Sequence, residues 1–171
     1  MILLDPDLAP DPGQRARTAE PRPTRIPAKP TLSRFLAQAQ AAARLRGEVT
    51  VLLTTDRAIR RLNRQFRGIN KPTDVLSFPA GGVGAEAMAG ELAISIPTAR
   101  RQGAADGHSL ATELKVLILH GLLHLAGYDH ETDTGQMARR ERQLRARLGL
   151  PLGLIERAVA APQARQRGSR P

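Results

Sequence analysis

The sequence predicts a layered domain of the α/β or α+β class, in which helices pack against a sheet of three or four short strands. The alternation of two kinds of segment along the chain favours this class. Short segments rich in β-branched and apolar residues alternate along the chain with longer segments of helical periodicity. The length of 171 residues suits a single domain, because typical domains contain about 100–150 residues.

In the first half of the chain, turn and capping residues separate the predicted elements. Thr31 can cap a helix at its start, and Gly47 and Gly68 can end helices. The six prolines of residues 9–30 favour an extended linker within the domain. The expected elements are strands at 2–4, 49–54 and 74–78 and helices at 32–46 and 56–66.

In the second half, a glycine-rich loop precedes one strand and three helices. Ser109 begins the most strongly patterned helix, and Gly149 ends the last one. We expect one domain over residues 1–155, followed by a basic, disordered tail at 156–171. The expected elements are a loop at 80–90, a strand at 91–96 and helices at 98–105, 109–126 and 134–148.

The composition excludes several kinds of site and partner. The chain has no cysteine, so it has neither disulfides nor thiolate-bound zinc or iron–sulfur clusters. No apolar run approaches the roughly 20 residues of a membrane span, and residues 1–4 are too few for the core of a signal peptide. We therefore expect a cytoplasmic protein with no membrane partner. Most of the net charge of +10 comes from residues after 138, so it is weak support for nucleic-acid binding by itself.

The histidines form the most informative pattern in the chain. His120 and His124 are four residues apart in a predicted helix, so both project from one helical face. Gly127 can end that helix and turn the chain back, which places His130 within reach of the other two. The spacing matches the three ligands of metzincin zinc proteases. Three neutral imidazoles suit one zinc ion per chain and leave a fourth position for water, so the pattern predicts a catalytic metal site.

Two further residues refine this prediction. Gly121 occupies the position where those proteases carry the glutamate that acts as general base. A phosphodiester substrate is therefore more plausible than a peptide, because a phosphate oxygen can itself accept a proton. His108 lies twelve residues before His120, or about 18 Å along a continuous helix. We expect it to cap the helix or to lie at the surface.

A run of arginines precedes the second predicted glycine stop. For Arg57 and Arg61 the simplest interpretation is the solvated side of an amphipathic helix. Arg67 differs because it lies at the helix end beside Gly68, where a guanidinium can bind a phosphate through two hydrogen bonds. The chain has only three phenylalanines and one tyrosine, so base stacking is not expected to be a large part of RNA binding.

Two segments of the chain resemble the bacterial YbeY endoribonucleases, also called ribosomal RNA maturation factors. They are residues 120–130 (HGLLHLAGYDH) and residues 66–79 (FRGINKPTDVLSFP). The resemblance covers about residues 31–150. It implies a mixed, mainly four-stranded sheet flanked by helices, an α+β fold with the metal site on a long helix in the C-terminal half. It also implies that His120, His124 and His130 are metal ligands and that Arg67 is functionally important.

The activity implied by the resemblance is zinc-dependent cleavage of single-stranded RNA. The expected partners are ribosomal RNA and the small ribosomal subunit, with roles in maturation of 16S ribosomal RNA and in ribosome quality control, and DNA is not an expected partner. Two alternatives stay open. One is a metalloprotease-like hydrolase, which Gly121 disfavours. The other is a non-catalytic ribosome-assembly factor that uses the metal site structurally.

Overall fold

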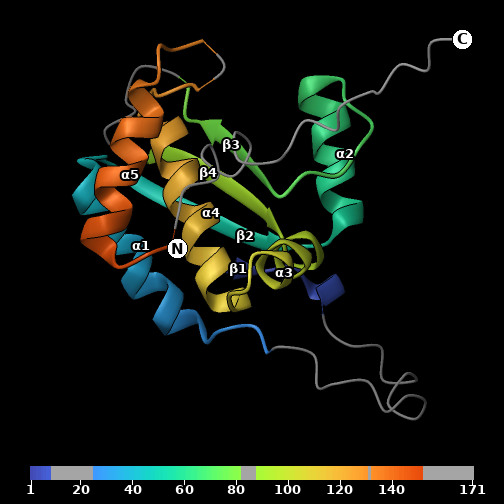
Figure 1. Cartoon of the computed structure of the whole chain (residues 1–171). Helices are drawn as coiled ribbons and strands as arrows, with labels where there is room; N and C mark the ends of the chain where they lie inside the picture. Colours follow the sequence, from blue (N-terminus) through green and yellow to red (C-terminus); the bar gives the residue numbers. More distant parts are fainter. Residues whose placement is uncertain (9–24, 82–87, 131, 152–171) are drawn as a thin grey trace, which may run out of the picture.

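A computed structural model of the chain describes residues 1–8, 25–81, 88–130 and 132–151. A four-stranded sheet with the order β1-β2-β4-β3 is flanked by helices (Figure 1). The strands are β1 (Ile2–Leu4), β2 (Glu48–Thr54), β3 (Val75–Pro79) and β4 (Met88–Ser95). The helices are a short 3-10 turn (Pro6–Leu8), α1 (Lys29–Ala43), α2 (Asp56–Arg67), α3 (Ile96–Ala105), α4 (Leu110–Leu125) and α5 (Gln136–Leu148).

The sheet is mixed. β1, β2 and β4 run parallel, and β3 pairs antiparallel with β4 at one edge. The predicted α+β class, with its four-stranded mixed sheet and a histidine cluster on a helix of the C-terminal half, is confirmed. Within the described ranges, none of the helices combines the length and the apolar character needed to cross a membrane.

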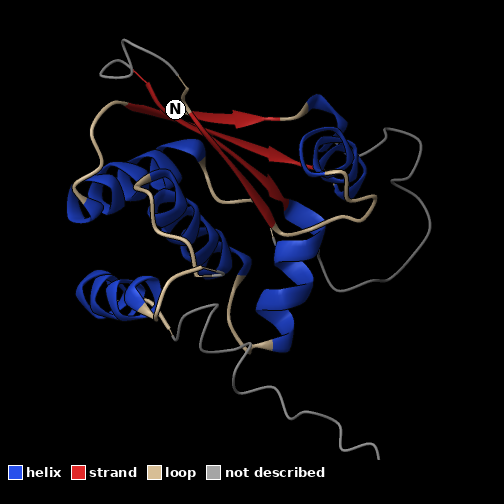
Figure 2. Cartoon of the chain, turned by 90° about the horizontal axis from the view of Figure 1, so that it is seen from above, coloured by secondary structure: helices blue, strands red, loops and turns tan. Residues whose placement is uncertain are grey.

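The two faces of the sheet are covered by different helices. Alternate residues of β4 point to opposite sides, so Leu92 and Ile94 join the main core whereas Ala93 packs with Ile59 of α2. In Figure 1, α1, α4 and α5 lie together on one side and α2 stands apart on the other. Viewed from above in Figure 2, the strands form a layer against the larger group of helices.

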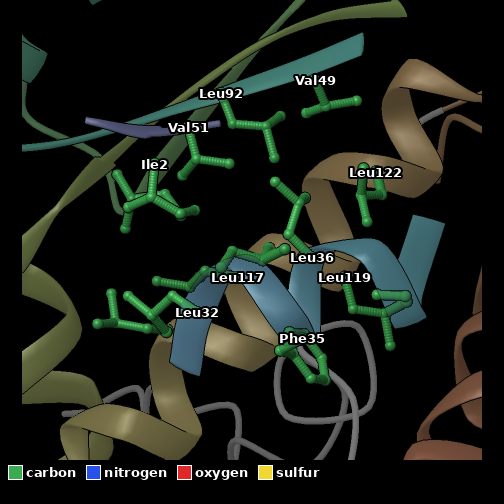
Figure 3. Close-up of a cluster of buried hydrophobic side chains, with 14 of the residues drawn as sticks. Ile2, Leu32, Phe35, Leu36, Val49, Val51, Leu92, Leu117, Leu119 and Leu122 are labelled. Carbon is green, nitrogen blue, oxygen red and sulfur yellow. The ribbon is translucent and has the colours of Figure 1, made fainter. Parts of the chain in front are cut away.

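The main core lies between the sheet and helices α1 and α4. Figure 3 shows strand side chains facing those of the two helices: Ile2, Val49, Val51 and Leu92 against Leu32, Phe35, Leu36, Leu117, Leu119 and Leu122. α4 is buried around most of its circumference, and Leu114, Leu117 and Leu122 are completely inaccessible to solvent. A helix packed on several sides holds its side chains in fixed positions, so α4 is a rigid support for the histidines that it carries.

Most of the predicted elements are confirmed to within a few residues, but three boundaries were wrong. α1 begins at Lys29 with Ala28 as its cap rather than Thr31, because Pro30 fits the first turn of a helix. It ends at Ala43, because Arg44, with φ of 59°, caps the helix in the left-handed conformation, whereas Gly47, with φ of 90°, lies beyond the helix end. β4 begins at Met88, inside the expected loop 80–90, where it pairs with β2.

Part of the domain prediction falls outside the described residues. Residues 9–24 of the expected linker lie outside the described residues, and so does the whole expected tail at 156–171. The end of the expected linker is described, and its last two residues form the start of α1.

Candidate metal centre

The end of α4 brings the three predicted ligands together. α4 begins at a Ser109 cap, whose hydroxyl accepts a hydrogen bond from the Thr112 amide. At the other end, Gly127 adopts φ of 88°, and its amide donates to the His124 carbonyl at 3.0 Å. This left-handed turn reverses the chain, so that His130 returns towards His120 and His124.

The geometry of the three imidazoles fits one metal ion. One ring nitrogen from each of His120, His124 and His130 lies within 4.8 Å of the others, and the Nε2 atoms of His120 and His124 are 3.2 Å apart. In a tetrahedral zinc site with Zn–N distances of about 2.0–2.1 Å, the ligand nitrogens are roughly 3.3–3.4 Å apart. The centre is closed on one side and open on the other, because His120 is buried, His124 is half-buried and His130 is exposed. A substrate can therefore approach from the side of His130.

A buried carboxylate lies behind the first ligand. Glu141 of α5 is 1% exposed, and its Oε2 lies 3.5 Å from His120 Nδ1, at the outer limit of a hydrogen bond. Its Oε1 accepts a hydrogen bond of 3.0 Å from Arg145 Nε, and Arg145 Nη1 donates to the Pro151 carbonyl. Such an arrangement places the imidazole proton on Nδ1 and directs the Nε2 lone pair towards the other two histidines.

The charges of the centre depend on its burial. Burial lowers the pKa of His124, and the neighbouring His120 and His130 lower it further. Burial also acts to raise the pKa of Glu141, but the hydrogen bond and charge of His120 together with Arg145 outweigh it and lower that pKa. His124 is therefore held neutral, as a metal ligand must be, and Glu141 is held ionised.

Gly121 has a packing role that accounts for its identity. A Cβ atom at this position would lie 2.7 Å from Cδ2 and 2.9 Å from Cδ1 of Leu92, closer than van der Waals contact allows. α4 therefore touches β4 directly at the residue after the first ligand. A glutamate, as in the metzincin proteases, fits there only if the Leu92 side chain shifts or α4 moves away from the sheet.

The expectation for His108 was wrong. Ser109 and not His108 caps α4, and the His108 side chain is only 15% exposed. Its Nε2 lies 2.5 Å from Oε2 of Glu113, a carboxylate with no exposure to solvent. Asp106 is close enough that the three side chains could also hold a metal ion, although Asp106 itself is exposed. The sequence offered one signal for this pair, an acidic residue at a core position of α4.

Comparison with known proteins identifies the family. Residues 20–149 match the family model described as endoribonuclease YbeY. The endoribonuclease YbeY of Solibacter usitatus is 48% identical over 129 residues, which cover 75% of this chain and 85% of that protein. The endoribonuclease YbeY of Koribacter versatilis is 51% identical over 129 residues, or 75% and 83% of the two chains. This chain belongs to the YbeY family.

A solved structure supports the fold. The solution structure of TM1509 from Thermotoga maritima superimposes with a TM-score of 0.52 and covers 99% of this chain and 100% of that one. At 22% sequence identity, the likeness concerns the fold alone.

The residues matched to the YbeY family include Arg67, which the structure does not bring into the histidine cluster. Arg67 is the last residue of α2, on the opposite face of the sheet from α4. Gly68, with φ of 70°, ends the helix, and the Asn63 side-chain amide donates to the Lys71 carbonyl at 2.8 Å. These contacts support the turn that follows Arg67, and the Arg67 side chain is exposed.

Proposed function

We propose that this chain is a zinc-dependent endoribonuclease that cuts single-stranded RNA. The observation that carries the proposal is the convergence of three imidazoles at the end of α4, within 4.8 Å of one another and open to solvent on one side. Membership of a family described as endoribonucleases supports RNA as the substrate. The proposed roles in the cytoplasm are maturation of the small-subunit 16S ribosomal RNA and ribosome quality control, in association with the small subunit.

The residues of this chain have distinct tasks in the proposed reaction. His120, His124 and His130 hold the divalent ion, and Glu141 fixes the orientation of His120. When bound, the ion supplies Lewis acidity, which activates water and withdraws charge from a phosphodiester oxygen. Gly121 stands where a metzincin protease carries its glutamate, and the close packing of Gly121 on Leu92 disfavours a larger residue there. A phosphodiester needs such a base less than a peptide does, because its own oxygens can accept a proton.

The proposal is tested by cleavage of unstructured and duplex RNA, with a peptide substrate as a further control. The purified protein should cut the unstructured RNA, lose this activity with a chelator and regain it when zinc is added back. Cleavage of the peptide would favour the metalloprotease-like alternative instead. Tight RNA binding without any cleavage, with or without added metal, would favour a non-catalytic assembly factor.

Arg67 is proposed as a catalytic residue that binds the scissile phosphate. Hydrolysis places negative charge on the phosphate oxygens, and a guanidinium can stabilise two of them at once. Arg67→Ala should lower single-turnover cleavage by about two to three orders of magnitude, the usual cost of losing one preorganised charged group. Arg67→Lys should recover only part of this loss, because lysine keeps the charge without the planar fork.

The control for this experiment is Arg57→Ala, which removes an exposed arginine from the first turn of the same helix. It should cut RNA at nearly the wild-type rate, and zinc content and melting temperature should be unchanged in all three variants. If Arg67→Ala and Arg67→Lys both cut at the wild-type rate, Arg67 has no part in the chemistry.

A further inference from the structure

The chain exposes one aromatic ring. Phe66, in the last turn of α2, is 60% exposed, whereas Phe35 is buried and Phe78 and Tyr128 are half-buried. The chain has no tryptophan, so these are all of its large aromatic side chains. Burying a phenylalanine normally stabilises a protein, and Phe66 forgoes most of that gain. A single exposed apolar residue is common, so the surroundings of the ring decide its meaning.

The ring of Phe66 is held in place on one side. It packs edge-to-face on Phe78 of β3, with ring centroids 5.0 Å apart and an interplanar angle of 65°. Phe78 in turn packs against the small core of Ile59, Leu76 and Ala93 beneath α2. Phe66 is therefore a fixed ring with a free surface, and not a side chain that must be ordered when a ligand arrives.

Positive charge surrounds this ring. Arg64 and Arg67 lie in the same last turn, Lys71 follows in the next loop, and all three are exposed. No acidic residue occurs between Asp56 and Asp74. One exposed carboxylate, that of Glu91, lies opposite Phe78 in the sheet, and Arg64, Arg67 and Lys71 outnumber it. An exposed aromatic surface beside these cations suits a ligand with flat rings joined by phosphates.

The ring also lies on a path to the histidine centre. A Cβ atom on Gly90 would be 2.5 Å from the Phe78 carbonyl oxygen and 2.7 Å from Cδ2 of Leu125, so both atoms lie next to Gly90. Leu125 directly follows the ligand His124 in α4. The Phe66–Phe78 pair and the metal centre are thus on two sides of the C-terminal end of β3. Because β3 is an edge strand, one RNA strand crossing this edge could contact both.

We propose that Phe66 stacks on one unpaired base of the RNA substrate while Arg64, Arg67 and Lys71 bind the adjacent phosphates. This inference rests on the proposed function and adds a reason for the single-strand preference. Bases of a duplex are already stacked on their neighbours and do not present a face to the ring. Stacking on one base is consistent with the low aromatic content of the chain, because a long series of stacked bases would need several exposed rings.

The test compares Phe66→Ala, Phe66→Trp and Phe66→Leu with the wild type. Binding of a short unstructured RNA is measured by fluorescence anisotropy within seconds of mixing, and KM and kcat are measured separately. Phe66→Ala should weaken binding by about five- to 150-fold, the usual loss for one base–aromatic stack, and raise KM more than it lowers kcat. Phe66→Trp should bind as tightly as the wild type. Ile69→Ala, which removes a neighbouring exposed apolar side chain, is the matched control and should change little.

A series of RNAs, each lacking one base, identifies stacking specifically. At one position, removal of the base should weaken binding to the wild type by the same factor as the Phe66→Ala substitution does. Removal of that base should not weaken binding to Phe66→Ala any further. The proposal is overturned if Phe66→Ala binds unstructured RNA normally, as expected if a protein partner covers Phe66. It is also overturned if Phe66→Leu binds as well as Phe66→Trp, or if no abasic position couples to Phe66. Binding with base-dependent coupling but without cleavage would instead refute the proposed nuclease activity and leave the stacking intact.

Discussion

Helix α4 has a histidine–glutamate pair near each of its ends, and the two pairs differ in which ring nitrogen faces the carboxylate. Near the start of the helix, His108 approaches Glu113 through Nε2 at 2.5 Å. Near its end, His120 approaches Glu141 through Nδ1 at 3.5 Å. Both glutamates are almost completely buried.

This difference favours His120 over His108 as a metal ligand. At His108 the close pairing uses Nε2, the nitrogen at the tip of the ring, and the neighbouring Asp106 is exposed to water. At His120 the carboxylate lies on the Nδ1 side, so Nε2 is directed at His124, 3.2 Å away. A buried carboxylate beside a histidine is therefore insufficient to identify a metal site. The free ring nitrogen must also converge with other donors.

Removing each histidine should have opposite consequences for activity and stability. His120→Gln should lower RNA cleavage by at least about two to three orders of magnitude, because it removes a ligand of the ion that stabilises the developing charge. His108→Gln should keep cleavage near the wild-type level while lowering the melting temperature, since Glu113 loses a partner that can carry charge. Single-turnover cleavage and thermal unfolding measure both. Equal losses of cleavage in the two variants would remove the distinction between the pairs.

Neutralising each glutamate should give a smaller but equally selective effect. Glu141→Gln should weaken zinc affinity by about 10- to 100-fold, the typical cost of changing a group that orients a metal ligand. Glu113→Gln should leave zinc affinity unchanged and destabilise the fold by about 1–3 kcal/mol through its weaker hydrogen bond with His108. Competition with a zinc chelator of known affinity checks the first expectation, and urea denaturation checks the second. A drop in zinc affinity in Glu113→Gln would contradict the assignment.

The smallest expected effect is that of pH on the metal-free protein. Burial and the neighbouring His120 and His130 lower the pKa of His124 below its ordinary value of 6.5. As pH falls through 6.5, the unfolded chain therefore takes up a proton at His124 before the folded protein does. The free energy of unfolding should decrease from about pH 8 to about pH 5.5, and His124→Ala should show a shallower decrease. Urea midpoints that rise towards low pH would be inconsistent with this.

The sequence was sufficient to predict the features that depend on local spacing. His120 and His124 share a helical face because they are four residues apart, and Gly127 is needed where the chain turns with positive φ. The same local logic located both glycine-terminated helices correctly, at Gly68 and Gly149. It was wrong at Gly47, because the helix already ends three residues earlier, where Arg44 is its left-handed cap.

Features that depend on packing between distant elements could not be predicted in this way. Glu141 is 21 residues from His120, and only the docking of α5 on α4 brings them together. The one available signal was that Glu141 and Arg145 share a helix face with the buried Met137 and Leu144, an unusual place for two charged residues. The pairing of His108 with Glu113 could not be predicted for a different reason, since an acidic residue in the first turn of a helix is common whether or not it has a side-chain partner.

The position of the metal site is tested by zinc content, measured by inductively coupled plasma mass spectrometry on His124→Ala, His108→Ala and the wild type. About one zinc ion per folded chain is expected in the wild type and in His108→Ala, because both retain His120, His124 and His130. Zinc close to background is expected in His124→Ala, with circular dichroism confirming that the variant is folded. Unchanged zinc in folded His124→Ala, or loss of zinc only in His108→Ala, would contradict the assignment of the metal to the end of α4.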